Sequence, residues 1–149
     1  MTAVAGADQL SLGPSPQVGT TVAASLSADL SITAATLTAV TSLSLGVGVW
    51  LVTGSATFTN GAATAAAIEA GLAAGTATAA FAGLQSAADE LPALTGGERQ
   101  VALTGCIVTV TVAGTIVLNA ESPNACTAKA ATSTYSLPNA TGITAVQVA

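Results

Sequence analysis

Apolar and polar residues alternate along several stretches of this chain, a period-two pattern typical of half-buried β-strands. The clearest stretch is residues 49–59, VWLVTGSATFT. One face of this predicted strand carries Trp50, Val52, Gly54, Ala56 and Phe58, and the other carries Leu51, Thr53, Ser55 and Thr57. Asn60-Gly61 follows, a dipeptide that favours a hairpin turn.

Two further stretches show the same alternation. In residues 41–48, TSLSLGVG, Leu43 and Leu45 alternate with serines before a glycine-rich turn. Residues 142–149, GITAVQVA, predict the last strand of the domain. Its two faces carry Ile143, Ala145 and Gln147 on one side and Thr144, Val146 and Val148 on the other.

Residues 106–122, CIVTVTVAGTIVLNAES, hold two β-branched runs around Ala113-Gly114, which predicts a second hairpin. Ile107 is out of phase with Val108, Val110 and Val112. The first run is therefore expected to be apolar on both faces and to lie centrally in its sheet. A weaker strand is expected over residues 125–135, ACTAKAATSTY, after a turn at SPNA.

Residues 61–83, GAATAAAIEAGLAAGTATAAFAG, are rich in alanine, the best helix former, yet they lie between strand-like segments. Ile68 and Leu72 fit one face of a helix and, with Ala70, one face of a strand equally well. Gly71 and Gly75 each cost about 1 kcal/mol inside a helix. Threonine and alanine also alternate in TATAAFAG, so we predict strands here. Alanine on a sheet face lets two layers or two subunits approach closely.

The remaining segments set the predicted domain boundaries. Residues 1–20 contain the proline pair of GPSP and little periodicity, so an extended N-terminal arm is expected, with a floppy terminus as the alternative. Residues 84–100 carry Asp89, Glu90, Glu98 and Arg99 and predict a long exposed loop. With about eight to ten strands and no helix, residues 21–149 predict an all-β antiparallel sandwich of the jelly-roll kind.

The amino-acid composition limits the classes of partner that this domain is expected to bind. The chain is 51% hydrophobic and only 6% charged, whereas soluble domains carry roughly 25% charged residues. Because exposed apolar surface usually marks an interface, we expect partners to cover much of it. The net charge is −5, with Arg99 and Lys129 the only cations, which argues against nucleic-acid binding. The sequence shows neither an apolar run long enough to span a membrane nor a secretory signal after Met1, so no membrane association is expected.

Candidate chemistry is sparse. There is no histidine, the commonest general base, and neighbouring charges such as Asp89-Glu90 and Glu98-Arg99 are typical of an exposed loop. Cys106 and Cys126 lack zinc-site spacing and are either a disulfide or two buried thiols. We therefore predict no catalytic residues, no cofactor and no metal. Four aromatic residues are assigned to core packing rather than to a ligand platform: Trp50, Phe58, Phe81 and Tyr135. The sequon at Asn139 is interpreted as a chance match.

Three segments together resemble the jelly roll of tumour-necrosis-factor and C1q-like domains. They are LTAVTSLSLGVGVWLVTGSATF (37–58), LTGCIVTVTVAGTIVLNAES (103–122) and GITAVQVA (142–149). Small versions rich in alanine and threonine are similar to structural proteins of tailed bacteriophages, which serve as capsid decoration proteins or fibre tips. The resemblance covers residues 30–149 loosely and implies a homotrimer.

The resemblance implies a non-enzymatic phage capsid decoration protein. Such a homotrimer would bind the major capsid protein on the outer surface of the virion, after assembly in the host cytoplasm, and stabilise the head. The alternative is the receptor- or glycan-binding tip of a phage tail or head fibre. A pilus or surface-layer subunit and an ice-binding protein are weaker alternatives, because no signal peptide and no fixed threonine repeat are found.

Overall fold

The computed structural model describes residues 18–75, 84–130 and 141–149, and these form ten β-strands without a helix. The predicted arm at residues 1–20 therefore lies almost entirely outside the described residues. The strands are β1 (Thr21–Ser25), β2 (Leu30–Ile32), β3 (Thr38–Leu45), β4 (Gly48–Asn60), β5 (Ala66–Ala74), β6 (Gln85–Leu91), β7 (Glu98–Val110), β8 (Gly114–Glu121), β9 (Cys126–Ala128) and β10 (Gly142–Gln147).

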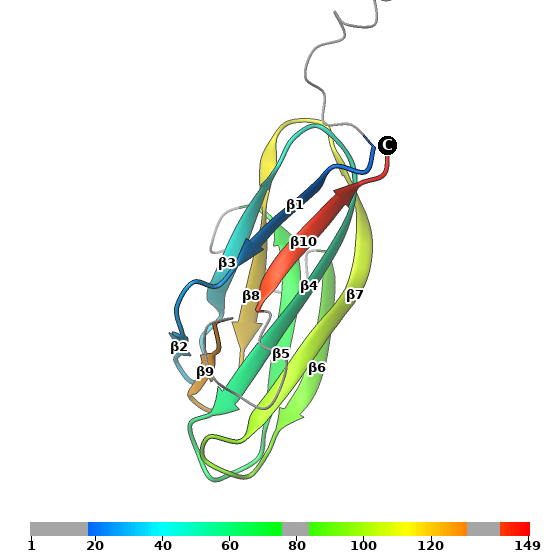
Figure 1. Ribbon diagram of the computed structural model, residues 1–149. Coiled ribbons are helices and arrows are strands. Elements are labelled where there is room, and N and C mark those ends of the chain that lie inside the picture. The colour runs from blue at the N-terminus through cyan, green and yellow to red at the C-terminus, as the bar shows by residue number, and fades with distance from the viewer. Residues whose placement is uncertain (1–17, 76–83, 131–140) are drawn as a thin grey trace, which may run out of the picture.

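The strands form two antiparallel sheets packed as a sandwich (Figure 1). In the six-stranded sheet, β4 is central: β10 and β9 pair with one of its edges and β7 with the other. β1 extends this sheet beyond β10, and β2 extends it beyond β9. The four-stranded sheet has the order β3-β8-β5-β6. Without the short strands β2 and β9, the two orders β1-β10-β4-β7 and β3-β8-β5-β6 are those of a jelly roll, as the sequence predicts.

The alanine-rich segment is a strand as far as it is described. β5 buries Ile68, Ala70 and Leu72 on one face and exposes Glu69, which confirms the predicted phase. Ala70 pairs with Ala87 on β6 and with Ala120 on β8, so three alanines stand in one row across the sheet. The TATAAFAG part of the prediction, residues 76–83, lies outside the described residues.

The two predicted hairpins are wrong. β4 and β5, which flank Asn60-Gly61, lie in different sheets, and so do β7 and β8, which flank Ala113-Gly114. Both dipeptides reverse the chain, but each turn crosses the sandwich. Turn chemistry specifies a local reversal and does not specify which strand the chain pairs with afterwards.

Two other predictions are corrected. Residues 84–100 are not one loop, since β6 and the start of β7 occupy most of them and only residues 92–97 connect the two. The acidic residues are tolerated because β6 is an edge strand, paired only with β5. The strand containing Ile107 is not central: in its sheet β7 pairs only with β4, and Ile107 is 62% exposed.

The core lies between the inner faces of the two sheets. Trp50 and Phe58 on β4 are buried there, as predicted, and the Trp50 indole N–H donates to the Gly46 carbonyl at 2.9 Å. Other fully buried large side chains come from both sheets and include Ile32, Ile68, Leu72, Leu91, Leu118 and Ile143. The last strand buries Ile143, Ala145 and Gln147, which confirms its predicted phase.

The buried side chain of Asn60, at the end of β4, connects the β4–β5 loop and the β6–β7 loop by hydrogen bonds. Its Nδ2 donates to the carbonyls of Thr64 and Pro92, each at 2.8 Å, and its Oδ1 accepts from the Ala62 N–H at 3.1 Å. Asn124 Nδ2 approaches the same Oδ1 at 3.4 Å. The Asn-Gly signal in the sequence therefore marks a loop-organising side chain.

Candidate interaction surface

The outer face of the six-stranded sheet carries a row of apolar side chains near one end of the sandwich. Register places Val146 of β10 opposite Leu51 of β4, and Leu51 opposite Ile107 of β7. Leu51 is 38% exposed and Ile107 is 62% exposed. Leu51 points away from the core because its chain neighbours Trp50 and Val52 are buried. Ile107 does so because its neighbours Cys106 and Val108 pack against the core.

More exposed valines gather at the same end. Val47 lies in the β3–β4 turn and Val112 in the β7–β8 turn, while the Val148 N–H bonds to the Val49 carbonyl at 2.8 Å. Val18 precedes Gly19, whose N–H bonds to the Gln147 carbonyl at 2.7 Å. We call this set the apical patch: Val18, Val47, Leu51, Ile107, Val112 and Val148.

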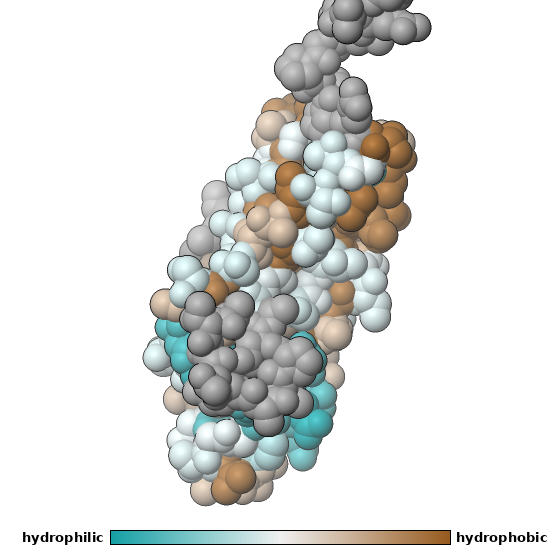
Figure 2. Space-filling view, viewed as in Figure 1, coloured by the Kyte–Doolittle hydropathy of each residue, from teal (hydrophilic) through white to brown (hydrophobic). Residues whose placement is uncertain are grey.

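The apical patch concentrates the exposed apolar side chains of the described residues. It contains every large hydrophobic residue exposed there except Leu94, which lies between β6 and β7. Figure 2 shows brown, hydrophobic surface gathered at the end of the molecule that holds the C-terminus. A concavity of about 260 Å³ at this end is lined by apolar residues that include Leu45, Val108, Val110, Val112 and Ile116. This end is therefore both apolar and hollowed.

A second concavity, of about 360 Å³, lies on the strands β1, β10 and β4. Gly54 and Gly142 lie in its lining, together with the hydroxyl-bearing residues Ser25, Thr53, Ser55, Thr141 and Thr144. Gly142 is needed for close approach, because a Cβ at this position would lie 2.5 Å from the Ala24 carbonyl oxygen. The concavity can offer hydroxyl groups to a ligand, but no charged side chain lines it.

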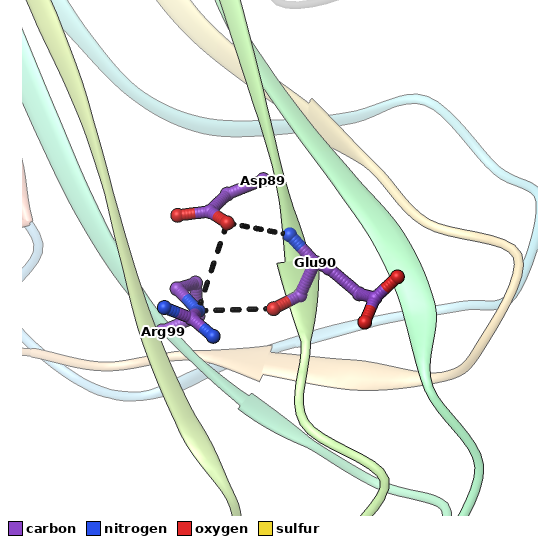
Figure 3. Close-up of polar contacts among 3 residues, drawn as sticks. All are labelled: Asp89, Glu90 and Arg99. Carbon is purple, nitrogen blue, oxygen red and sulfur yellow. Dashed lines mark hydrogen bonds and ion pairs between the residues drawn. The ribbon is translucent and has the colours of Figure 1, made fainter.

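Asp89, Glu90 and Arg99, which the sequence places in an exposed loop, instead connect β6 of one sheet with β7 of the other (Figure 3). Arg99 on β7 donates through Nε to the Glu90 carbonyl on β6 at 2.9 Å and lies 3.8 Å from Asp89 Oδ1. Asp89 Oδ1 also accepts the Glu90 N–H at 2.7 Å. Gln85 adds a second bridge, accepting the Gly105 N–H and donating to the Thr104 hydroxyl, each at 3.0 Å. This arrangement is structural and leaves both carboxylates near solvent.

The two cysteines are free thiols, so the disulfide alternative is wrong. Cys106 pairs with Val52 on one edge of β4, and Cys126 pairs with Asn60 on the other. Eight residues of β4 separate the two pairing positions, about 27 Å along an extended strand, whereas a disulfide needs Cα atoms within about 7 Å. Burial raises the pKa of the Cys106 thiol and raises the pKa of Cys126 to about 11. Both thiols are therefore protonated at neutral pH, which makes them poor nucleophiles and poor metal ligands.

Only some of the remaining sequence predictions fall on residues that the structure describes. Phe81, Tyr135 and Asn139 lie outside the described residues, so their predicted roles stay predictions. Within the described ranges, no group of three or more His, Cys, Asp and Glu side chains is arranged to hold a metal ion. The same residues contain no helix that could span a bilayer. The apical patch was not predicted, although Leu51 already stood out among hydroxyl residues on the outward face.

Comparison with known proteins identifies the fold. No family model and no curated protein sequence matches this chain. A chain in the structure of the infectious bursal disease virus Gt strain aligns over 93% of this chain, with 10% identity and a TM-score of 0.52. A chain in the structure of the T13 infectious bursal disease virus particle also aligns over 93%, with 8% identity and a TM-score of 0.50. This chain spans 42% and 39% of those two chains. At this identity the likeness shows a shared β-sandwich fold.

Proposed function

We propose that this chain is a non-enzymatic structural protein of a virus particle. The observation that carries the proposal is the fold, which is similar over 93% of the chain to chains of two viral-particle structures. The family resemblance of the sequence points the same way, toward tailed bacteriophages. Because the matched chains are more than twice as long as this one, the assembly and partners of those proteins are extended to it only as a proposal.

The finer proposal is a homotrimeric decoration protein on the outer surface of a phage head. The apical patch supports self-association, because contiguous apolar surface on a domain of low charge is the usual mark of an interface. Val18, the first described residue, belongs to the apical patch and lies beside the end of β10 through the bond of Gly19 to Gln147. The arm would then lie beside the trimer contact and extend to the major capsid protein. A trimer bound across several capsid subunits would stabilise the assembled head, because it binds only the assembled form.

Binding to virus particles tests this function. Particles that lack the protein are incubated with the purified full chain or with a chain deleted for residues 2–17, sedimented, and assayed for bound protein. We expect saturable binding of the full chain and loss of binding by the deleted chain, while native mass spectrometry shows that both remain trimers. The proposal is overturned if the full chain does not bind, or if native spectra show only monomer at micromolar concentration.

A second candidate is the glycan-binding tip of a phage fibre. The concavity with the hydroxyl groups of Ser25, Thr53, Ser55 and Thr144 favours it, because sugars are bound through hydrogen bonds at shallow polar sites. Sugar sites also use exposed aromatic rings, and the two aromatic residues of the described part, Trp50 and Phe58, are buried. Calorimetric titration with host cell-wall polysaccharide distinguishes the candidates: heat of binding that Thr53→Ala removes supports the fibre tip, and its absence supports decoration.

A further inference from the structure

Lys129 and Asp29 meet at the outer rim of the six-stranded sheet. Asp29 directly precedes β2, and Lys129 directly follows β9. The two short strands pair through Leu30 and Ala128, so the charged residues occupy the next position along the ladder. A hundred residues of sequence separate them, and their side chains are in direct contact through Lys129 Nζ and Asp29 Oδ2.

Both partners are held in place by the backbone. The N–H of Lys129 donates to the Thr57 carbonyl of β4 at 2.8 Å, which fixes the start of the lysine side chain. The N–H of Ala130 donates to Asp29 Oδ1 at 2.8 Å, which fixes the carboxyl group from its other oxygen. The amine is therefore held against the carboxyl group of Asp29, in contact with one of its oxygens while the backbone holds the other.

The burial of this lysine is unusual for the chain. Its side chain is only 6% exposed, while the Asp29 side chain is 36% exposed. The other cation of the protein, Arg99, keeps 43% of its side chain exposed in its pair with Asp89. A buried ammonium group is costly even when it is paired, because its lost hydration is only partly replaced. A neutral amide linkage between the same two side chains would remove both charges from this site.

We propose that Lys129 and Asp29 form an intramolecular isopeptide bond. The ammonium group transfers a proton to the carboxylate, which leaves a neutral amine beside a neutral carboxylic acid. The lone pair of Nζ attacks the Asp29 carboxyl carbon, and a C–N bond forms. The C–O bond to the carboxyl hydroxyl then breaks, and this oxygen leaves as water with one proton from the amine and its own proton. No electrons are transferred to or from another reagent.

The fold favours this condensation in two ways that free amines and carboxylic acids in water do not have. Groups held in reactive contact act at effective concentrations of about 10⁵ to 10⁸ M, and burial disfavours the charged forms that block the reaction. The exposed side of Asp29 gives the released water a path to solvent. The bond would join the two shortest strands of the sheet, β2 and β9, and would close a loop spanning a hundred residues of the chain.

Mass spectrometry of the denatured full chain tests the proposal directly. An isopeptide bond lowers the intact mass by one water, about 18 Da. Trypsin cleaves after lysine and arginine, and the chain has one of each. An unlinked chain yields the peptides 1–99, 100–129 and 130–149. A linked chain is not cleaved at Lys129 and yields one branched species, 1–99 joined to 100–149, because the acylated lysine is no longer a substrate.

Matched variants identify the bond. Lys129→Met and Asp29→Ala should restore the full calculated mass, and Asp29→Asn should lose ammonia, about 17 Da, in place of water. Asp89→Ala removes the exposed ion pair with Arg99 and should keep the mass deficit of the wild type. A wild-type chain of full mass that gives three tryptic peptides overturns the proposal and leaves an ordinary ion pair. A mass deficit without the branched species also overturns it, because the water was then lost elsewhere.

Discussion

Leu51 of β4 and Ile107 of β7 stand opposite each other in register on the outer face of the six-stranded sheet, and both are exposed. Neighbouring outward positions of the same sheet carry hydroxyl-bearing residues such as Thr53 and Thr109. Two branched apolar side chains side by side on such a surface form the centre of the apical patch, and in the proposed homotrimer they would be the main contact with a second copy of the chain.

Charge at this pair should disrupt self-association. We expect Leu51→Asp and Ile107→Asp each to weaken the oligomer by about 2 kcal/mol or more, about a thirtyfold rise in the dissociation constant. Analytical ultracentrifugation over a concentration series measures the change. Ala102→Asp is the matched control, since Ala102 is also exposed on the outer face of β7 but lies outside the patch. Equal oligomerisation of all three variants would show that the interface lies elsewhere.

The alanine row of the four-stranded sheet sets the spacing of the sandwich. Ala70 is fully buried between Ala87 and Ala120, so a larger side chain must push the layers apart. We expect Ala70→Leu to cost about 1–3 kcal/mol of unfolding free energy through overpacking. Ala67→Leu, on the exposed face of the same strand, should stay within about 0.5 kcal/mol of the wild type. Urea titrations at one fixed protein concentration compare them, and equal stabilities would mean that the core has spare room.

Alternation was enough to predict the strands with one polar face. Residues 49–59 and 142–149 fold in the predicted phase, and the glycines of the alanine-rich segment correctly argued against a helix. The sequence did not show which of the two sheets each strand joins. A turn dipeptide such as Ala113-Gly114 looks the same whether it joins two paired strands or connects strands of different sheets. β6 was missed because an edge strand needs little apolar character. The apical patch needed the topology, since Val47, Val112 and Val148 come from three separate segments.

Asn60 should be the most sensitive polar residue at the opposite end of the sandwich. Its removal takes the Asn60 donor from the Pro92 carbonyl and the Asn60 acceptor from the Ala62 N–H, whereas the Thr64 carbonyl keeps its bond from Asn124 Nδ2 at 2.9 Å. We expect Asn60→Ala to lower the free energy of unfolding by about 1–3 kcal/mol, the usual cost of unpaired buried polar groups. Thr36→Ala removes an exposed hydroxyl that bonds to the Ala34 carbonyl and serves as the control, with little change expected. An Asn60→Ala chain as stable as the control would mean that water replaces the lost donor.

Cys126 should make the protein sensitive to alkaline pH. Burial raises the pKa of its thiol in the folded chain from the ordinary value of 9.0 to about 11, so the folded state holds this proton more tightly than the unfolded state. Between these two values the unfolded chain binds fewer protons, and its free energy falls relative to the folded state as pH rises. The stabilisation is thus complete below pH 9 and is lost as pH approaches 11.

The contribution of the Cys126 thiol can be measured from the dependence of the unfolding free energy on pH. Urea titrations of the wild type and of Cys126→Ala between pH 8 and 11 should show a shallower decline for the variant, because Ala has no proton to lose. Cys106→Ala is the matched control: the pKa of Cys106 is also raised, but its thiol is only half-buried, so a smaller change in slope is expected. If the decline of the wild type and of Cys126→Ala is parallel, the Cys126 thiol titrates alike in both states, and its side chain is reached by water in the folded protein.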